Sequence, residues 1–278
     1  MVIYHIFFDL LQYYHDVVMI YHDGTRLVAK LTDYQGRPIV NDIIYFTING
    51  KTYREYEDIN TEEFINIINE GHIPVSSQPA IGEVLNVYNE NEDCEIINIS
   101  MADGLSGTYN SACMAKGMAE NPERIDVINS KTLCGPHRYL VNLAAELVKQ
   151  GKTKQEIVNE INNTLEDTKS YLIPHDFDFL VRGGRVSALV GKIGSAIKLV
   201  PVMTMAEDKL SLVKFTTKRT FKRALQKISE DMINKGINSN YKIYISHACN
   251  EELAKSAENI ILEYIENADI ETNLLGPV

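Results

Sequence analysis

The chain has 278 residues, of which 45% are hydrophobic and 23% are charged, and its formal net charge at pH 7 is −11. This length and apolar fraction are enough for two packed domains and exclude a wholly disordered chain. The acidic balance argues against a nucleic-acid-binding surface. The four cysteines lie far apart, at Cys94, Cys113, Cys134 and Cys249. Because they have no paired metal-ligand spacing, we expect reduced thiols in a cytoplasmic protein and no metal site.

The N-terminal segment is apolar but does not resemble a membrane anchor. Among residues 2–20, polar side chains such as His5, Asp9 and Asp16 interrupt the apolar ones, and no basic segment typical of a signal peptide precedes them. We therefore expect a packed strand or helix here and no stable membrane insertion. A short strand is expected next, over residues 26–31.

A hairpin and two helices are predicted before residue 90. The strands are expected over 43–48 and 51–54, and the helices over 62–69 and 81–89. Asn49-Gly50 joins the two strands and is typical of a two-residue hairpin turn. Ser76 and Ser77 lie on a loop bounded by prolines. They either cap the helix that follows or contact a ligand.

The segment around Ser106 combines a strand, a glycine-bracketed turn and a helix. An apolar strand is expected over 95–99, and the turn Gly104-Leu-Ser-Gly107 leads into a helical pattern over 108–118. This geometry directs backbone N–H groups and the positive end of a helix dipole at one point. A hydroxyl among those donors suits a carboxylate or a phosphate.

Two other interpretations of Ser106 stay open. A serine on a strand-to-helix turn can be a hydrolase nucleophile in the pattern G-x-S-x-G, but here the second glycine comes one residue early. A nucleophile would also need a base within hydrogen-bond reach. Alternatively, the glycines only form a turn and Ser106 caps the helix.

Strands and helices alternate up to residue 165. A strand is expected over 125–128 and helices over 138–149 and 155–165, the last opened by a capping box of Thr153 and Glu156. This alternation implies a parallel sheet with helices on its faces.

The pattern changes near residue 171. Arg182-Gly-Gly-Arg185 precedes an expected helix over 187–198 that has small residues on one face. Strands are then expected over 197–205, 210–215 and 241–247, with helices ending near residue 234 and beginning after Asn250. The basic cluster at residues 217–223 is either a solvated helix face or a docking site for a partner.

These motifs, in this order, resemble the DegV family, the bacterial fatty-acid-binding proteins that serve fatty acid kinase. The resemblance covers about residues 42–278. It is carried by Asn49-Gly-Lys-Thr-Tyr-Arg54, Ser76-Ser-Gln-Pro79, Gly104-Leu-Ser-Gly-Thr-Tyr109, Arg182-Gly-Gly-Arg-Val186, Lys218-Arg-Thr220 and Ser246-His-Ala248.

The resemblance implies a two-domain α/β fold of the DegV type. Each domain would be a mainly parallel sheet flanked by helices, with a ligand tunnel between the domains. The N-terminal domain would span residues 1–170, of which 1–30 are an atypical extension. The C-terminal domain would span 171–278 and would be truncated before the family's last motif.

The resemblance also implies a function. The chain would bind a long-chain fatty acid and present its carboxylate to the catalytic subunit of a fatty acid kinase, which forms the acyl-phosphate. It would use no cofactor and would not itself be an enzyme, since the sequence has no usual phosphate-binding loop for ATP. A serine hydrolase using Ser106 and a carrier of another small anion remain the alternatives.

The family's motifs assign the site residues. The ligand-binding residues would be Ser76, Ser77, Gly104, Ser106, Gly107, Thr108, Arg185 and His247, and Arg219 would contact the kinase. A fatty acid also needs a long apolar cavity with polar groups at one end, because each exposed methylene costs about 0.8 kcal/mol.

Overall fold

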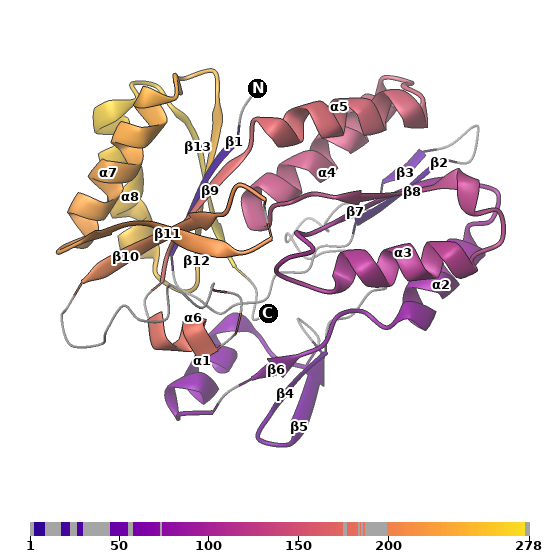
Figure 1. Cartoon of the computed structure of the whole chain (residues 1–278), viewed down its shortest axis with the longest axis horizontal. Helices are drawn as coiled ribbons and strands as arrows, with labels where there is room; N and C mark the ends of the chain where they lie inside the picture. The colour runs from indigo at the N-terminus through magenta and orange to yellow at the C-terminus, as the bar shows by residue number, and fades with distance from the viewer. Residues whose placement is uncertain are drawn as a thin grey trace. The chain divides into compact units, whose positions relative to one another are not determined.

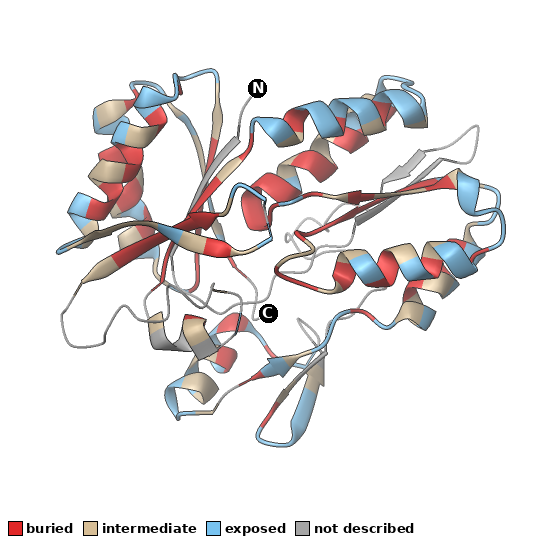
Figure 2. Cartoon of the chain, in the orientation of Figure 1, coloured by how far each residue is buried: buried red, intermediate tan, exposed pale blue. Residues whose placement is uncertain are grey.

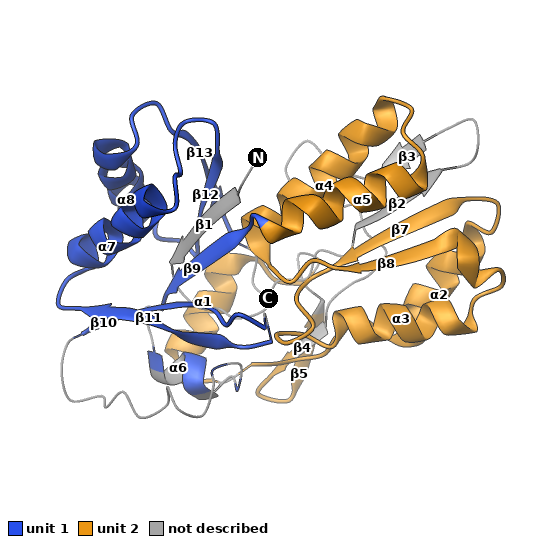
Figure 3. Ribbon diagram, turned by 45° about the horizontal axis from the view of Figure 1, so that its top comes forward, with its two compact units in different colours: residues 1–12, 167–275 blue, residues 13–166, 276–278 orange. Residues whose placement is uncertain are grey.

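The computed structural model describes residues 3–8, 18–22, 27–29, 45–54, 58–72, 74–174, 177–182, 184, 186, 199–208 and 210–275. The chain forms two compact units (Figure 3). Unit 1 comprises residues 1–12 and 167–275, and unit 2 comprises residues 13–166 and 276–278. The division predicted at residue 170 differs from this one at the N-terminus. The strand β1 (Ile3–Phe8) belongs with the second half of the chain because it pairs with strands there.

Unit 1 contains a six-stranded sheet in the order β11-β10-β9-β1-β12-β13 (Figure 1). The other strands are β9 (Lys169–Ile173), β10 (Val200–Met205), β11 (Leu212–Lys218), β12 (Lys242–His247) and β13 (Asp269–Leu274). Strands β9, β1, β12 and β13 are parallel to one another, whereas β10 is antiparallel to both of its neighbours. The mainly parallel sheet predicted for this domain is confirmed.

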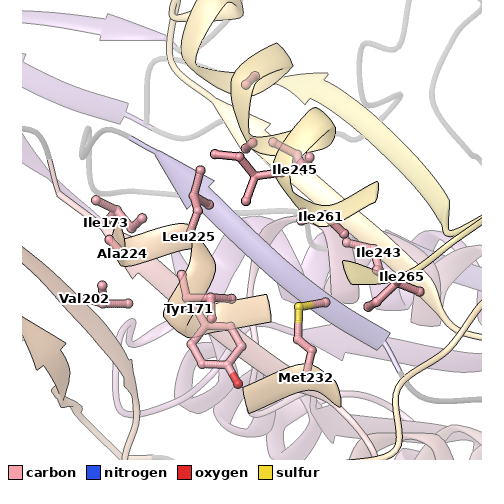
Figure 4. Packing of buried hydrophobic residues seen from close by; sticks show 14 of the residues in the cluster. Tyr171, Ile173, Val202, Ala224, Leu225, Met232, Ile243, Ile245, Ile261 and Ile265 are labelled. Carbon is pink, nitrogen blue, oxygen red and sulfur yellow. The ribbon is translucent and has the colours of Figure 1, made fainter. Parts of the chain in front are cut away.

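Two helices, α7 (Phe221–Asn234) and α8 (Glu251–Tyr264), pack against this sheet. Figure 4 shows Leu225 and Met232 of α7 and Ile261 of α8 in one cluster with side chains from β9, β10 and β12. The buried residues of each helix recur every three or four positions, as expected for an amphipathic helix. Each large apolar side chain buried in this way stabilises the fold by about 1.5–3 kcal/mol. The short helix α6 (Phe177–Arg182) also belongs to unit 1.

Unit 2 contains a four-stranded sheet in the order β3-β2-β7-β8. Its strands are β2 (Val18–His22), β3 (Leu27–Ala29), β7 (Glu95–Ser100) and β8 (Ile125–Asn129). Only the β7–β8 pair is parallel, which differs from the mainly parallel sheet expected here. Strands β2 and β3 are antiparallel because residues 23–26 are too few for a parallel crossover.

Helices cover both faces of this sheet. They are α2 (Ile81–Glu90), α3 (Thr108–Met118), α4 (Cys134–Lys149) and α5 (Lys154–Glu166), and the 3-10 turn η1 (Pro122–Arg124) follows α3. Ile96 of β7 packs with α2 and α3, whereas Ile97 and Ile99 pack with α4 and α5. Strand β7 is therefore buried on both sides (Figure 2), which explains why isoleucines occupy both of its faces. Hydrogen bonds between Thr153 and Glu156 confirm the capping box that begins α5.

A small sheet in the order β5-β4-β6 completes unit 2. It consists of β4 (Tyr45–Ile48), β5 (Lys51–Arg54) and the two-residue strand β6 (Val75–Ser76), and the helix α1 (Thr61–Asn69) lies between β5 and β6 in sequence. Asn49 and Gly50 both have positive φ, which confirms the predicted hairpin turn. Within the described ranges, no helix combines the length and the apolarity needed to cross a membrane.

Candidate ligand-binding site

The loop between β7 and α3 is held by hydrogen bonds of its own backbone. The N–H groups of Leu105 and Ser106 both donate to the carbonyl oxygen of Ala102, at 3.0 and 3.1 Å. Ala102 in turn donates to the carbonyl oxygen of Thr132, at 2.9 Å, in the segment after β8. The turns that follow the two parallel strands are thus joined, which fixes where Ser106 lies relative to the sheet.

The hydroxyl of Ser106 forms hydrogen bonds with the first turn of α3. Its Oγ lies 2.8 Å from Oγ1 of Thr108 and accepts the N–H of Thr108 at 3.3 Å. Both residues are buried, and Gly107 between them is the N-cap residue of α3. Ser106 is therefore not the N-cap residue of α3, although its hydroxyl accepts the N–H of the first helical residue. This geometry places two hydroxyl groups at a helix N-terminus, the arrangement that suits an anion.

The Ser-Ser-Gln-Pro loop lies against the same helix end. Ser76 pairs with Phe46 in the small sheet, and the side chain of Gln78 donates from Nε2 to Oγ of Ser111, at 2.9 Å. Ala80, rather than either serine of the loop, is the N-cap residue of α2, so the interpretation of these serines as caps is wrong. The structure therefore brings two serine motifs of unit 2 together at α3.

Gln78 was not singled out from the sequence. The contact that reveals it is tertiary: a Cβ added at Gly107 would lie 1.6 Å from Oε1 of Gln78. The only signal in the sequence is that a glutamine stands within the first serine motif and a glycine within the second.

An acidic and a phenolic group also lie near the start of α3, namely Asp103 on the loop before it and Tyr109 in its first turn. A hydrogen bond to Cys113, burial and the charge of Asp103 raise the pKa of Tyr109, so its phenol is neutral near pH 7. Asp103 is half-buried and its N–H donates to Oδ1 of Asn129 at 3.4 Å. A ligand carboxylate at α3 would be repelled by Asp103, so hydroxyl and amide donors must outweigh that repulsion.

A chain of hydrogen bonds between buried polar side chains holds the carboxyl end of β7 in place. Nδ2 of Asn98 donates to the hydroxyl of Tyr88 at 3.0 Å, and the hydroxyl of Ser100 donates to Oδ1 of Asn98 at 2.7 Å. All three residues are fully buried. Because buried polar groups are costly when unpaired, this chain fixes the orientation of the strand that leads to the site.

His247 lies at the carboxyl end of β12 in unit 1. It is buried, and its Nδ1 accepts the N–H of Asn250, the N-cap residue of α8, at 3.1 Å. Burial lowers the pKa of His247, and the charge of Glu251 only partly opposes that effect. The imidazole is therefore neutral near pH 7, with its proton on Nε2.

Arg219 follows β11 at the start of the basic cluster. It lines an open depression of about 300 Å³. The other lining residues are Thr217, Lys218, Arg223, Gln226, Lys227 and Glu230. Thr220 caps α7 there by accepting the N–H of Arg223 at 3.3 Å. The ends of β11 and β12 lie at the same edge of the sheet but four strand spacings apart, roughly 19 Å.

The structure groups the predicted site residues by unit. Ser76, Ser77, Gly104, Ser106, Gly107 and Thr108 belong to unit 2, and His247 and Arg219 belong to unit 1. Arg185 and the helix expected over 187–198 lie outside the described residues. In the described part of the chain, no cluster of three or more His, Cys, Asp and Glu side chains is arranged to hold a metal ion.

By its fold, the chain is a mixed α/β protein with a strand–turn–helix junction rich in hydroxyl and amide donors. Comparison with known proteins identifies its family. A family model described as "Uncharacterised protein, DegV family" matches residues 43–278. A DegV domain-containing protein of Staphylococcus aureus (strain N315) is 34% identical over 237 residues, which are 84% of this chain and 83% of the relative. The chain belongs to the DegV family.

Solved structures of the same family share the fold. DegV of Bacillus subtilis, described as a fatty acid binding protein, is 25% identical with a TM-score of 0.71 and coverage of 100% of this chain and 94% of that chain. The fatty acid kinase (Fak) B3 protein of Streptococcus pneumoniae, loaded with linoleic acid, is 20% identical with a TM-score of 0.76 and the same coverage of the two chains. These neighbours confirm the resemblance inferred from the motifs.

Proposed function

We propose that this protein binds a long-chain fatty acid and presents its carboxylate to the catalytic subunit of a fatty acid kinase. The observation that carries the proposal is the pair of buried hydroxyls, Ser106 and Thr108, at the N-terminus of α3, with the Ser76–Ser77 loop held beside them. Membership of a family whose solved members bind fatty acids supports the identity of the ligand.

The junction has the donors that a carboxylate requires. A carboxylate only accepts hydrogen bonds, and hydroxyls and helix N–H groups can donate to it. Each hydrogen bond to a charged group contributes about 1.5–3 kcal/mol, and the helix dipole adds about 0.3–1 kcal/mol. Two or three such bonds suffice to orient the head group, while the apolar chain supplies most of the affinity.

The family's motifs name two further ligand-binding residues, His247 of unit 1 and Arg185. A neutral His247 with its proton on Nε2 and the guanidinium of Arg185 are both hydrogen-bond donors, which is the chemistry that a carboxylate requires. No cofactor is required for this role, since hydrogen bonding and burial bind the ligand without changing it. The chain therefore acts as a carrier and not as an enzyme.

The basic depression around Arg219 is the proposed contact with the kinase. It presents four cationic side chains on a chain whose net charge is −11, and only one carboxylate, Glu230, lines it. Such a patch fits an acidic surface of a partner and would accelerate encounter by electrostatic steering. Because acyl-phosphate formation needs a phosphoryl donor such as ATP, we propose a cytoplasmic location.

Native mass spectrometry of the purified protein, followed by denaturing extraction, tests the proposal. We expect one long-chain fatty acid per chain in the wild type and loss of most of it in Ser106→Ala. Ser239→Ala, in an exposed turn of unit 1, is the matched control and should retain the ligand. A wild-type protein that carries no fatty acid and binds none when it is added would overturn the proposal.

A further inference from the structure

We propose that Gln78 is a positioning residue that clamps the Ser76–Ser77 loop to the first turn of α3. This inference rests on the proposed function, because it concerns how the head-group donors are held. The clamp has two ends, one at Gly107 and one at Ser111.

The first end of the clamp explains why residue 107 is a glycine. Gly107 has φ −74° and ψ 0°, a conformation that any residue adopts, so the backbone does not require glycine here. An added Cβ, however, would lie 1.6 Å from Oε1 and 2.5 Å from Cδ of Gln78, so a side chain at residue 107 would displace this carboxamide. The carboxamide of Gln78 therefore occupies the volume that any other side chain at residue 107 would fill.

The second end of the clamp is a hydrogen bond. Nε2 of Gln78 donates to Oγ of Ser111 at 2.9 Å, and Ser111 is buried one turn further along α3. The N–H of Ser111 donates to the carbonyl oxygen of Gly107 at 2.9 Å, so both ends of the clamp belong to one helical turn. Gln78 is an exposed residue, and a glutamine held by a single weak contact would move freely in water. Contact at two points fixes its carboxamide.

The consequence of the clamp is preorganisation. On the loop side, Ser76 is paired with Phe46 in the small sheet and Pro79 is buried, so Gln78 links two already ordered segments. With the clamp in place, the hydroxyls of the Ser76–Ser77 loop stand at a fixed distance from those of Ser106 and Thr108. Donors that are already aligned do not lose conformational entropy when the carboxylate arrives.

Three variants test the clamp by their coupling. In delipidated protein, Gln78→Ala should weaken oleic acid binding roughly tenfold, the effect of one lost hydrogen bond and a loosened loop. Gly107→Ala should cost about the same, because its methyl group expels the carboxamide. The double variant should bind no more weakly than Gln78→Ala alone, since nothing is left to expel. Losses that multiply to about a hundredfold would overturn the clamp.

Two controls separate positioning from general damage. Oleyl alcohol has the same chain without the carboxylate, so the variants should bind it as the wild type does; an equal loss for the alcohol would refute a head-group role. Gln155→Ala removes a similar exposed contact, from Nε2 to Oδ1 of Asn159 at 2.9 Å, and should change neither affinity.

Hydrogen exchange distinguishes failure of the clamp from failure of the proposed function. If the wild type binds neither oleic acid nor oleyl alcohol, the function is refuted but the clamp can still be measured. The amides of Ser77, Gln78 and Ala80 should then exchange faster in both Gln78→Ala and Gly107→Ala than in the wild type. Unchanged exchange at these amides would refute the clamp whatever the ligand result.

Discussion

Replacing Asn98 by alanine should destabilise unit 2 by several kcal/mol. Asn98 makes two buried side-chain hydrogen bonds, at 3.0 Å to Tyr88 and at 2.7 Å from Ser100, and all three residues have 0% exposure. Each buried group that loses its partner costs about 1–3 kcal/mol, so the two bonds together predict a loss of roughly 2–6 kcal/mol. Since whole domains are stable by about 5–15 kcal/mol, this loss would be plain in equilibrium unfolding.

Two measurements test this loss: equilibrium denaturation in urea, and native-state hydrogen exchange of the β7 amides. The urea concentration at the midpoint should fall, while the slope of the free energy of unfolding against urea concentration stays unchanged. The β7 amides should lose protection from exchange. Asn110→Ala, on the exposed face of α3, is the control and should change the free energy of unfolding by less than about 0.5 kcal/mol. A loss for Asn98→Ala no larger than that of the control would refute the reasoning that the chain of buried polar groups supports β7.

Two further predictions concern proton binding. Burial lowers the pKa of His247 from 6.5, so the unfolded state binds a proton more readily than the folded state does. The preference of the folded state for the neutral ring therefore stabilises the protein fully above pH 6.5. This stabilisation is lost as the pH falls from 6.5 toward the lowered pKa. Between pH 7.5 and pH 5.5, the free energy of unfolding should fall more in the wild type than in His247→Gln. An equal fall in the two proteins would contradict this prediction. The backbone N–H and hydroxyl of Thr153 lower the pKa of Glu156 to about 2. Thr153→Ala removes the hydroxyl but keeps the N–H, so it should raise this pKa only part of the way toward 4.5 in an NMR titration. An unchanged pKa would contradict a contribution from the hydroxyl.

Local chemistry allowed much of the fold to be predicted from the sequence. Asn49-Gly50 specified the hairpin through its positive φ angles, and the capping box at Thr153 marked where a helix begins. The run that became β7 has isoleucines on both faces, and the sheet that contains it is covered on both sides. These signals act over a few residues, so they can be recognised without knowing the rest of the molecule.

Features that depend on distant pairing were missed. Strand β6 has only two residues and exists because Phe46 pairs with Ser76. Strand β13 was not predicted, since it is set by its parallel pairing with β12 rather than by its own polar composition. The role of Gln78 depends on a contact with Gly107, which no local pattern contains.

The place of β1 in unit 1 has a consequence for synthesis of the chain. Tyr4 pairs with Lys169 and Ile3 pairs with Lys242, so β1 lies between two strands from the second half of the chain. On a translating ribosome, residues 13–166 of unit 2 can fold as soon as they emerge, whereas β1 must wait for β9 and β12. Pairing over such sequence distances is slow to form, and an unpaired strand is prone to aggregation meanwhile. Strand β1 therefore leaves the ribosome long before the two strands with which it pairs.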